Sequence, residues 1–158
     1  MTETTTKYKN VFIEGAVSPA FIGESIGKHS SKTGIGAHDI FLGQVRNDVI
    51  DDGHGEQKEV AAIEYSAYEE MALKEFHRIR EAAFEKFELS CLHIYHSLGR
   101  VEVGEISLFV FASSMHRKAA MDAVRFLVDN IKREAPVFGK EIFADGTHVW
   151  KSNAEMQK

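Results

Sequence analysis

Apolar and polar positions along the chain follow two periods, one typical of helices and one typical of strands. Helical spacing predicts three helices, at 18–30, 68–87 and 116–134. In the first, Ser18 is the expected N-cap and Pro19 takes the first helical position, where proline is tolerated. In the third, which Ser113 or Ser114 is expected to cap, charged residues recur along one side and apolar residues along the other. That pattern predicts a surface helix packed on a sheet.

Short apolar runs bounded by turn residues predict the strands. They lie at 10–15, 35–48, 60–68, 90–99 and 106–114, with two shorter strands around the Ala-Asp-Gly turn inside 139–151. The segment 49–59 is charged and rich in glycine, so we expect a mobile loop there.

The predicted order is therefore β-α-β-β-α-β-β-α-β-β with short links. Helices that alternate with hairpin-like strand pairs favour an α+β sandwich with a mostly antiparallel sheet. We expect a single domain over 1–158, with flexible tails at 1–7 and 151–158.

Composition excludes several functions. The formal net charge of the 158 residues is −5, so the chain has no overall basic field to hold nucleic acid or an anionic membrane. No apolar stretch approaches the length of a membrane span, and the first ten residues lack the apolar core of a signal peptide, so we expect a cytoplasmic protein. A single cysteine, Cys91, excludes an internal disulfide.

Metal and cofactor sites are not expected. His93 and His96 are three residues apart in a predicted strand, where they point to opposite faces. The other histidines show no ligand spacing, and the glycine-rich loops that cradle nucleotide phosphates are missing. Cys91 has no cationic neighbour in the sequence that would activate it as a nucleophile.

Cations occur where the backbone changes direction. Arg46 ends a strand, His116 and Arg117 open a helix, and Lys132 and Lys140 lie on either side of Pro136. Each fits an ordinary solvated charge, and Lys132 also complements the end of its helix. Together they fit a site for a small anion, in which the helix break lets the two lysines face one reacting group.

The length of the last helix limits how these cations combine. His116 and Lys132 are sixteen residues apart, or roughly 24 Å at 1.5 Å per residue. One small ligand does not span that distance, so a site that uses both requires a second copy of the chain. We therefore expect a homodimer with composite pockets.

Several blocks of sequence in a fixed order carry a resemblance to a known family. They are FLGQVRND, IEYSAYEEMA, HSLGRVEVGE, SSMHRKAAMDAVRFLVDNIKREAP and the FGKE that precedes Trp150, and they run from about residue 35 to residue 150. In these blocks the chain resembles the large, catalytic subunit of molybdopterin synthase.

The resemblance implies a sulfurtransferase of molybdenum cofactor biosynthesis. Sulfur would pass from the C-terminal Gly-Gly thiocarboxylate of a small ubiquitin-like subunit to cyclic pyranopterin monophosphate, forming the dithiolene of molybdopterin. The implied assembly is a heterotetramer with a homodimer of large subunits at its centre. The implied fold is an α/β hammerhead with a small additional antiparallel sheet, and no cofactor is implied.

The resemblance also implies the site residues. Lys132 and Lys140 match the two active-site lysines, with Lys132 as the catalytic group and Lys140 as the residue that positions substrate and stabilises charge. The matching substrate-binding positions are Gln44, Val45, Arg46, His116, Arg117, Lys132, Lys140, Glu141 and Ile142. The alternative is a non-catalytic anion-binding or scaffold homologue.

Three positions depart from the family pattern. Ser97 replaces an arginine, Gly139 stands where an aromatic residue commonly precedes the lysine, and the chain after Trp150 lacks the arginine that some members contribute to the neighbouring subunit. Lys151 is a candidate to replace that arginine, without its bidentate geometry.

Overall fold

Residues 8–151, which a computed structural model describes, form eight strands and three helices. In chain order they are β1 (Phe12–Glu14), α1 (Pro19–Gly27), β2 (Ala37–Gln44), β3 (Val49–Asp51), β4 (Gln57–Ala67), α2 (Glu69–Lys86), β5 (Cys91–Glu102), β6 (Ile106–Ser114), α3 (Arg117–Glu134), β7 (Val137–Phe143) and β8 (His148–Trp150).

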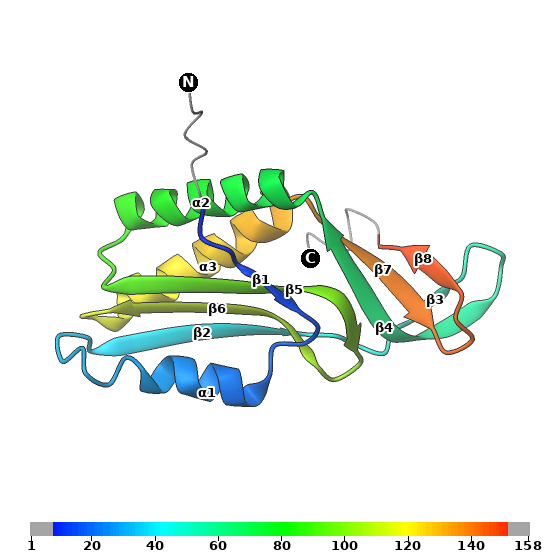
Figure 1. The fold of residues 1–158 in the computed structure, drawn as a ribbon, viewed down its shortest axis with the longest axis horizontal. Helices are drawn as coiled ribbons and strands as arrows, with labels where there is room; N and C mark the ends of the chain where they lie inside the picture. Colours follow the sequence, from blue (N-terminus) through cyan, green and yellow to red (C-terminus); the bar gives the residue numbers. More distant parts are fainter. Residues whose placement is uncertain (1–7, 152–158) are drawn as a thin grey trace, which may run out of the picture.

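The strands join into one sheet in the order β2-β6-β5-β4-β7-β8, with β1 added to β5 and β3 added to β4. All pairs are antiparallel except β1 with β5. The long strand β5 joins the two halves, because its first part pairs with β6 and its last part pairs with β4 (Figure 1). The two parts meet at Gly99, whose φ of +80° favours glycine.

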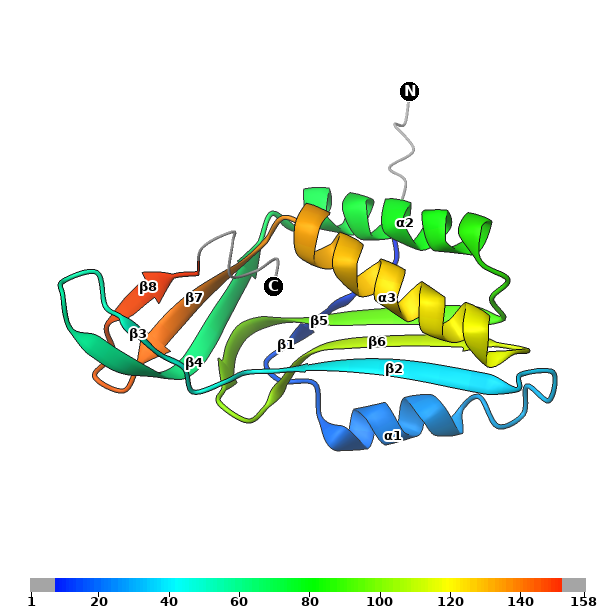
Figure 2. The same cartoon turned by 180° about the vertical axis from the view of Figure 1, so that it is seen from behind.

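The helices cover both faces of the first half of the sheet. Helices α2 and α3 lie on one face, and α1 lies on the other (Figure 2). The main core forms under α2 and α3, and a smaller cluster around Phe109 and Phe111 forms under α1. Because it is covered on both sides, β6 reads as a continuous apolar run instead of alternating.

The three predicted helices and the mostly antiparallel α+β architecture are confirmed, with helix ends shifted by a few residues. The predicted mobile loop at 49–59 is wrong, because β3 pairs there with the start of β4. Asp51 and Asp52 stabilise the turn by accepting hydrogen bonds from the backbone N–H groups of Gly53 and His54, at 2.8 and 2.7 Å. Such aspartate turns close a hairpin even where glycine and charge suggest a loose segment.

The start of α3 also differs from the expectation. His116 is the N-cap residue and makes no side-chain capping hydrogen bond. Ser114 still contributes, since its Oγ accepts a hydrogen bond from the Ala120 N–H at 3.1 Å. The predicted tails at 1–7 and 151–158 lie outside the described residues, except for Lys151. Within the described range, none of the helices has the length and apolar character that a membrane crossing requires.

Candidate active site

A cavity of about 260 Å³ lies where the end of α3 meets the second half of the sheet. Six helices and strands (β2, β4, β5, β6, α3 and β7), the segments that join them and one residue beyond β8 contribute to its wall. The polar and charged side chains that line it are Gln44, Arg46, Asp48, Tyr65, His96, Ser107, Lys132, Glu141 and Lys151.

Lys132 enters this cavity from the last turn of α3. The helix ends at Glu134 because Ala135 precedes Pro136, and a residue before proline is disfavoured in helical geometry. Burial lowers the pKa of Lys132, and the positive charge of Lys151 lowers it further. A lysine with a lowered pKa reaches its neutral, basic form at a lower pH than an ordinary surface lysine.

Lys151, the residue directly after β8, borders the same cavity as Lys132. Its backbone N–H donates a hydrogen bond to the Gly139 carbonyl at 2.9 Å, which holds the residue beside β7. A Cβ placed on Gly139 would stand 3.9 Å from the Lys151 Cβ. The same Cβ would stand only 3.2 Å from Ile63 Cγ2, so glycine at position 139 lets the β7 backbone pack closely against β4 and Lys151.

Lys140 lies on the other face of β7. Neighbouring strand residues point to opposite faces, and it is Gly139 and Glu141 that line the cavity. The Lys140 Nζ instead lies 3.5 Å from Glu64 Oε1 and 5.8 Å from the centre of the Trp150 ring. The expectation that Lys132 and Lys140 face one site is therefore wrong within a single chain.

His96 is a cavity residue that the sequence analysis did not select. Its Nδ1 lies 2.8 Å from the Ser97 carbonyl, which only accepts, so Nδ1 carries the proton and Nε2 remains an acceptor. Burial lowers the pKa of His96 to about 4, and Lys132 adds to that effect. The sequence does contain one signal for His96. Along β5 it falls on the same side as the apolar residues Leu92 and Ile94, and this places it on the face that α3 covers.

Tyr65 forms the wall beside His96, with ring centres 5.1 Å apart. Its hydroxyl donates a hydrogen bond to Ser107 Oγ at 3.1 Å, and burial raises the pKa of Tyr65. This phenol therefore stays protonated and is available as a hydrogen-bonding group on the wall.

Most predicted substrate-binding residues near Lys132 do meet at this cavity. Gln44, Val45, Arg46 and Glu141 line it, whereas Ile142 belongs to the opposite face of β7 and is buried. The Arg46 side chain is 68% exposed and pairs with Asp48 at 3.0 Å. Among residues 8–151 its guanidinium contacts Asp48 in this surface ion pair, and so weak a contact lets the group turn toward an anion in the cavity mouth.

His116 and Arg117 lie elsewhere. They border an open hollow of about 420 Å³ at the beginning of α3, together with Gly36, Ala37, Met115 and Lys118. Lys132 lies in the last turn of the same helix. The structure therefore does not bring the two groups of predicted site residues together within one chain.

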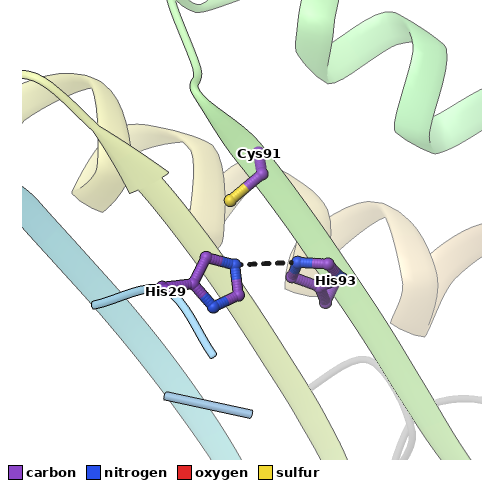
Figure 3. A group of neighbouring side chains, drawn as sticks. All are labelled: His29, Cys91 and His93. Carbon is purple, nitrogen blue, oxygen red and sulfur yellow. Dashed lines mark hydrogen bonds between the residues drawn. The ribbon is translucent and has the colours of Figure 1, made fainter. Parts of the chain in front are cut away.

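A group with metal-ligand chemistry is present on the other face of the sheet. His29, Cys91 and His93 place their ligand atoms within 4.8 Å of one another (Figure 3). The prediction that His93 and His96 point to opposite faces is confirmed, since His93 contacts His29 and Phe111 while His96 lines the cavity. His29 lies 64 residues from His93 in the chain, so no spacing in the sequence points to this pair.

Comparison with known proteins gives a consistent result. Residues 18–134 match the family model described as MoaE protein. The chain is 38% identical over 123 residues to the molybdopterin synthase catalytic subunit of Dictyostelium discoideum, covering 76% of this chain and 74% of the relative. It is 36% identical over 116 residues to that of Pyrococcus abyssi, covering 73% and 74%.

Solved structures agree with this similarity. Molybdopterin synthase from Staphylococcus aureus superposes with a TM-score of 0.74 at 26% identity, covering 89% of this chain and 95% of that one. The complex of subunits 1 and 2 of the molybdopterin-converting factor from Helicobacter pylori gives a TM-score of 0.73 at 20% identity, covering 89% and 88%, which is a likeness of fold.

Proposed function

Because the chain belongs to the MoaE protein family and is a molybdopterin synthase catalytic subunit of molybdenum cofactor biosynthesis, we propose that its Lys132 cavity is the site of sulfur transfer. The sulfur donor is the C-terminal thiocarboxylate of a small ubiquitin-like subunit, and the acceptor is cyclic pyranopterin monophosphate. The observation that carries this assignment is a half-buried lysine of lowered pKa in a cavity that also presents a second cation.

Lys132 is the catalytic group of this proposal. Once the thiocarboxylate sulfur has bonded to the pterin, water attacks the acyl carbonyl and creates an oxyanion, whose collapse breaks the acyl–sulfur bond and leaves a carboxylate. The attacking water loses a proton and the departing sulfur gains one, and Lys132 transfers these protons. A lysine whose neutral form is accessible transfers such protons more readily than an ordinary ammonium group.

Lys151 takes the place that was expected for Lys140. It lines the cavity beside Lys132, whereas Lys140 pairs with Glu64 on the other face. A fixed ammonium at this position stabilises the developing oxyanion or the substrate phosphate. Arg46 at the mouth of the cavity adds a guanidinium, which suits bidentate contact with phosphate oxygens.

His116 and Arg117 enter the proposal through a second copy of the chain. Their hollow and the Lys132 cavity lie at opposite ends of α3, so one ligand reaches both sets only across a dimer interface. We assign the central homodimer, with one small subunit at each end, as the working assembly in the cytoplasm. The two halves of the sheet then correspond to the hammerhead and the additional antiparallel sheet of one catalytic-subunit domain.

Conversion of cyclic pyranopterin monophosphate to molybdopterin tests the assignment directly. The full chain is mixed with thiocarboxylated small subunit, and wild type is compared with Lys132→Ala. Conversion by wild type and its loss in the variant support the proposal. If the variant turns over normally and only substrate affinity falls, Lys132 is not the catalytic group.

Mixing two inactive variants tests the composite site. In a heterodimer of Lys132→Ala and Arg117→Ala chains, one of the two sites keeps both residues. Random exchange of subunits therefore restores about a quarter of the wild-type sites. A mixture that stays inactive despite exchange, or a fully active monomer in sedimentation, contradicts the composite site.

A further inference from the structure

Three side chains with metal-binding donors meet under α1, on the face of the sheet opposite the Lys132 cavity. Cys91 and His93 lie two residues apart on β5 and therefore share a face, and His29 comes from the segment after α1. Figure 3 shows the two imidazole rings turned toward one another, with the cysteine sulfur beside them. The two Nε2 atoms are 3.1 Å apart.

The tautomer of His29 is fixed by its neighbour. The His29 Nδ1 lies 2.7 Å from the Ser25 carbonyl oxygen, which only accepts, so Nδ1 carries the proton. The Nε2 atom consequently keeps a free lone pair that points at His93. A carbonyl that orients a histidine through its second nitrogen is the usual support of a metal-ligating histidine.

The spacing of the two nitrogen donors suits a small tetrahedral ion, and the Cys91 sulfur lies within 4.8 Å of both. Two nitrogens bound at 2.0–2.1 Å in tetrahedral geometry are separated by about 3.3 Å. The observed 3.1 Å between the Nε2 atoms differs from that by a shift that side-chain rotation absorbs. Two imidazoles and one thiolate form a donor set that Zn²⁺ prefers, and three protein ligands leave a fourth position for water.

The surroundings are largely dry. His29 is 7% exposed and Cys91 is 8% exposed. The ring of Phe111 lies 4.8 Å from that of His29 and 5.9 Å from that of His93, centre to centre. An apolar wall of this kind limits solvent access and strengthens the attraction between a cation and a thiolate.

Lys9 competes with an ion for this site. Its Nζ lies 3.4 Å from His93 Nδ1, so Lys9 donates to that nitrogen while the His93 Nε2–H donates to His29. A metal at Nε2 requires the imidazole proton on Nδ1, which then faces the ammonium group. Lys9 is exposed, so its side chain has room to turn away when the ion binds.

We infer that His29, Cys91 and His93 form a Zn²⁺ site that fastens the segment after α1 to strand β5. Binding releases the Cys91 thiol proton to solvent, moves the His93 proton from Nε2 to Nδ1 and displaces Lys9. The ion contributes no group to the Lys132 cavity, which lies across the sheet. The inference is therefore independent of the sulfur-transfer proposal.

Titration of the full chain with Co²⁺, the spectroscopic substitute for Zn²⁺, tests the site. Wild type should give the thiolate-to-cobalt absorption band and the visible bands of tetrahedral Co²⁺, both reversed by Zn²⁺. Zn²⁺ should also raise the melting temperature of wild type, since it binds only the folded chain. Cys91→Ser should lose the thiolate band, and His29→Gln should weaken Zn²⁺ binding by at least about tenfold.

Two further variants make the result decisive. Lys9→Met leaves all three ligands in place and removes the competitor, so it should bind Zn²⁺ more tightly than wild type. His54→Gln, in the exposed β3–β4 turn, should bind like wild type. Absence of the thiolate band in wild type, or equal Zn²⁺ affinity in wild type and a folded Cys91→Ser chain, overturns the inference.

Discussion

Lys140 and Glu64 face one another across β7 and β4, with Nζ and Oε1 3.5 Å apart. This pair lies on the face of the strands away from the cavity, since the neighbouring residues Gly139 and Glu141 line that cavity. The two lysines that flank Pro136 are thus separated by the strand itself. They should differ sharply in their effect on catalysis.

Lys132→Ala should lower kcat for molybdopterin formation by a hundredfold or more, the usual range for loss of a proton-transfer group. Lys140→Ala removes an ammonium that lies outside the cavity and should cost less than about tenfold. Single-turnover kinetics with thiocarboxylated small subunit separates the two effects. Equal losses in both variants would contradict this expectation and would indicate that Lys140 acts in the active site of a second copy of the chain.

Lys151→Met should change the pH dependence of catalysis. The Lys151 charge lowers the pKa of Lys132, so its removal raises that pKa. If the neutral amine is the active form, the rising limb of kcat/KM against pH moves to higher pH. The profile of Lys140→Met serves as the control and should stay in place. If the rising limb of Lys151→Met stays at the wild-type pH, the charge of Lys151 does not affect the pKa of Lys132.

His96 should make the fold sensitive to acid. Burial lowers its pKa from the ordinary 6.5 to about 4. Between these two pH values the imidazole is protonated in the unfolded chain and neutral in the folded chain. The contribution of neutral His96 to the free energy of unfolding is therefore complete above pH 6.5 and declines as the pH falls toward 4. The loss over this range is roughly 3 kcal/mol.

Urea unfolding of wild type and His96→Gln between pH 7 and pH 4 measures this contribution. The variant should lose less free energy of unfolding over that interval, because it lacks the titrating ring. His93, whose pKa is also lowered to about 4, is present in both proteins and cancels in the comparison. Parallel curves for the two proteins would contradict the neutral, buried state of His96.

Ser97→Ala should leave the protein as stable as wild type or raise its free energy of unfolding by about 1 kcal/mol. The Ser97 Oγ is buried and finds no hydrogen-bond partner among residues 8–151, so alanine removes an unsatisfied polar group. Ser113→Ala is the matched control. Its buried Oγ lies 2.7 Å from His38 Nδ1, and its loss should cost about 1 kcal/mol. Destabilisation by Ser97→Ala would indicate a partner for this hydroxyl.

Much of the fold was predictable because it depends on local periodicity. The apolar stripe of α3, with Ala120, Leu127 and Ile131, determines both that the segment is helical and which side it buries. The hairpin of β3 and β4 was not predictable in this way. It depends on aspartate side chains that close the turn and on Lys58, whose Nζ lies 3.0 Å from Asp52 and 2.9 Å from Asp145.

The sequence by itself determined the helices, most strands, the family and the position of Lys132 at a helix end beside a proline. Only the tertiary structure decided which residues share a site with it. The alternation of β7 turns Lys140 away, the turn between β7 and β8 returns Lys151 to Gly139, and the packing of α1 brings His29 to His93. Period and propensity act over a few residues, whereas these contacts depend on strand register and on how distant elements pack.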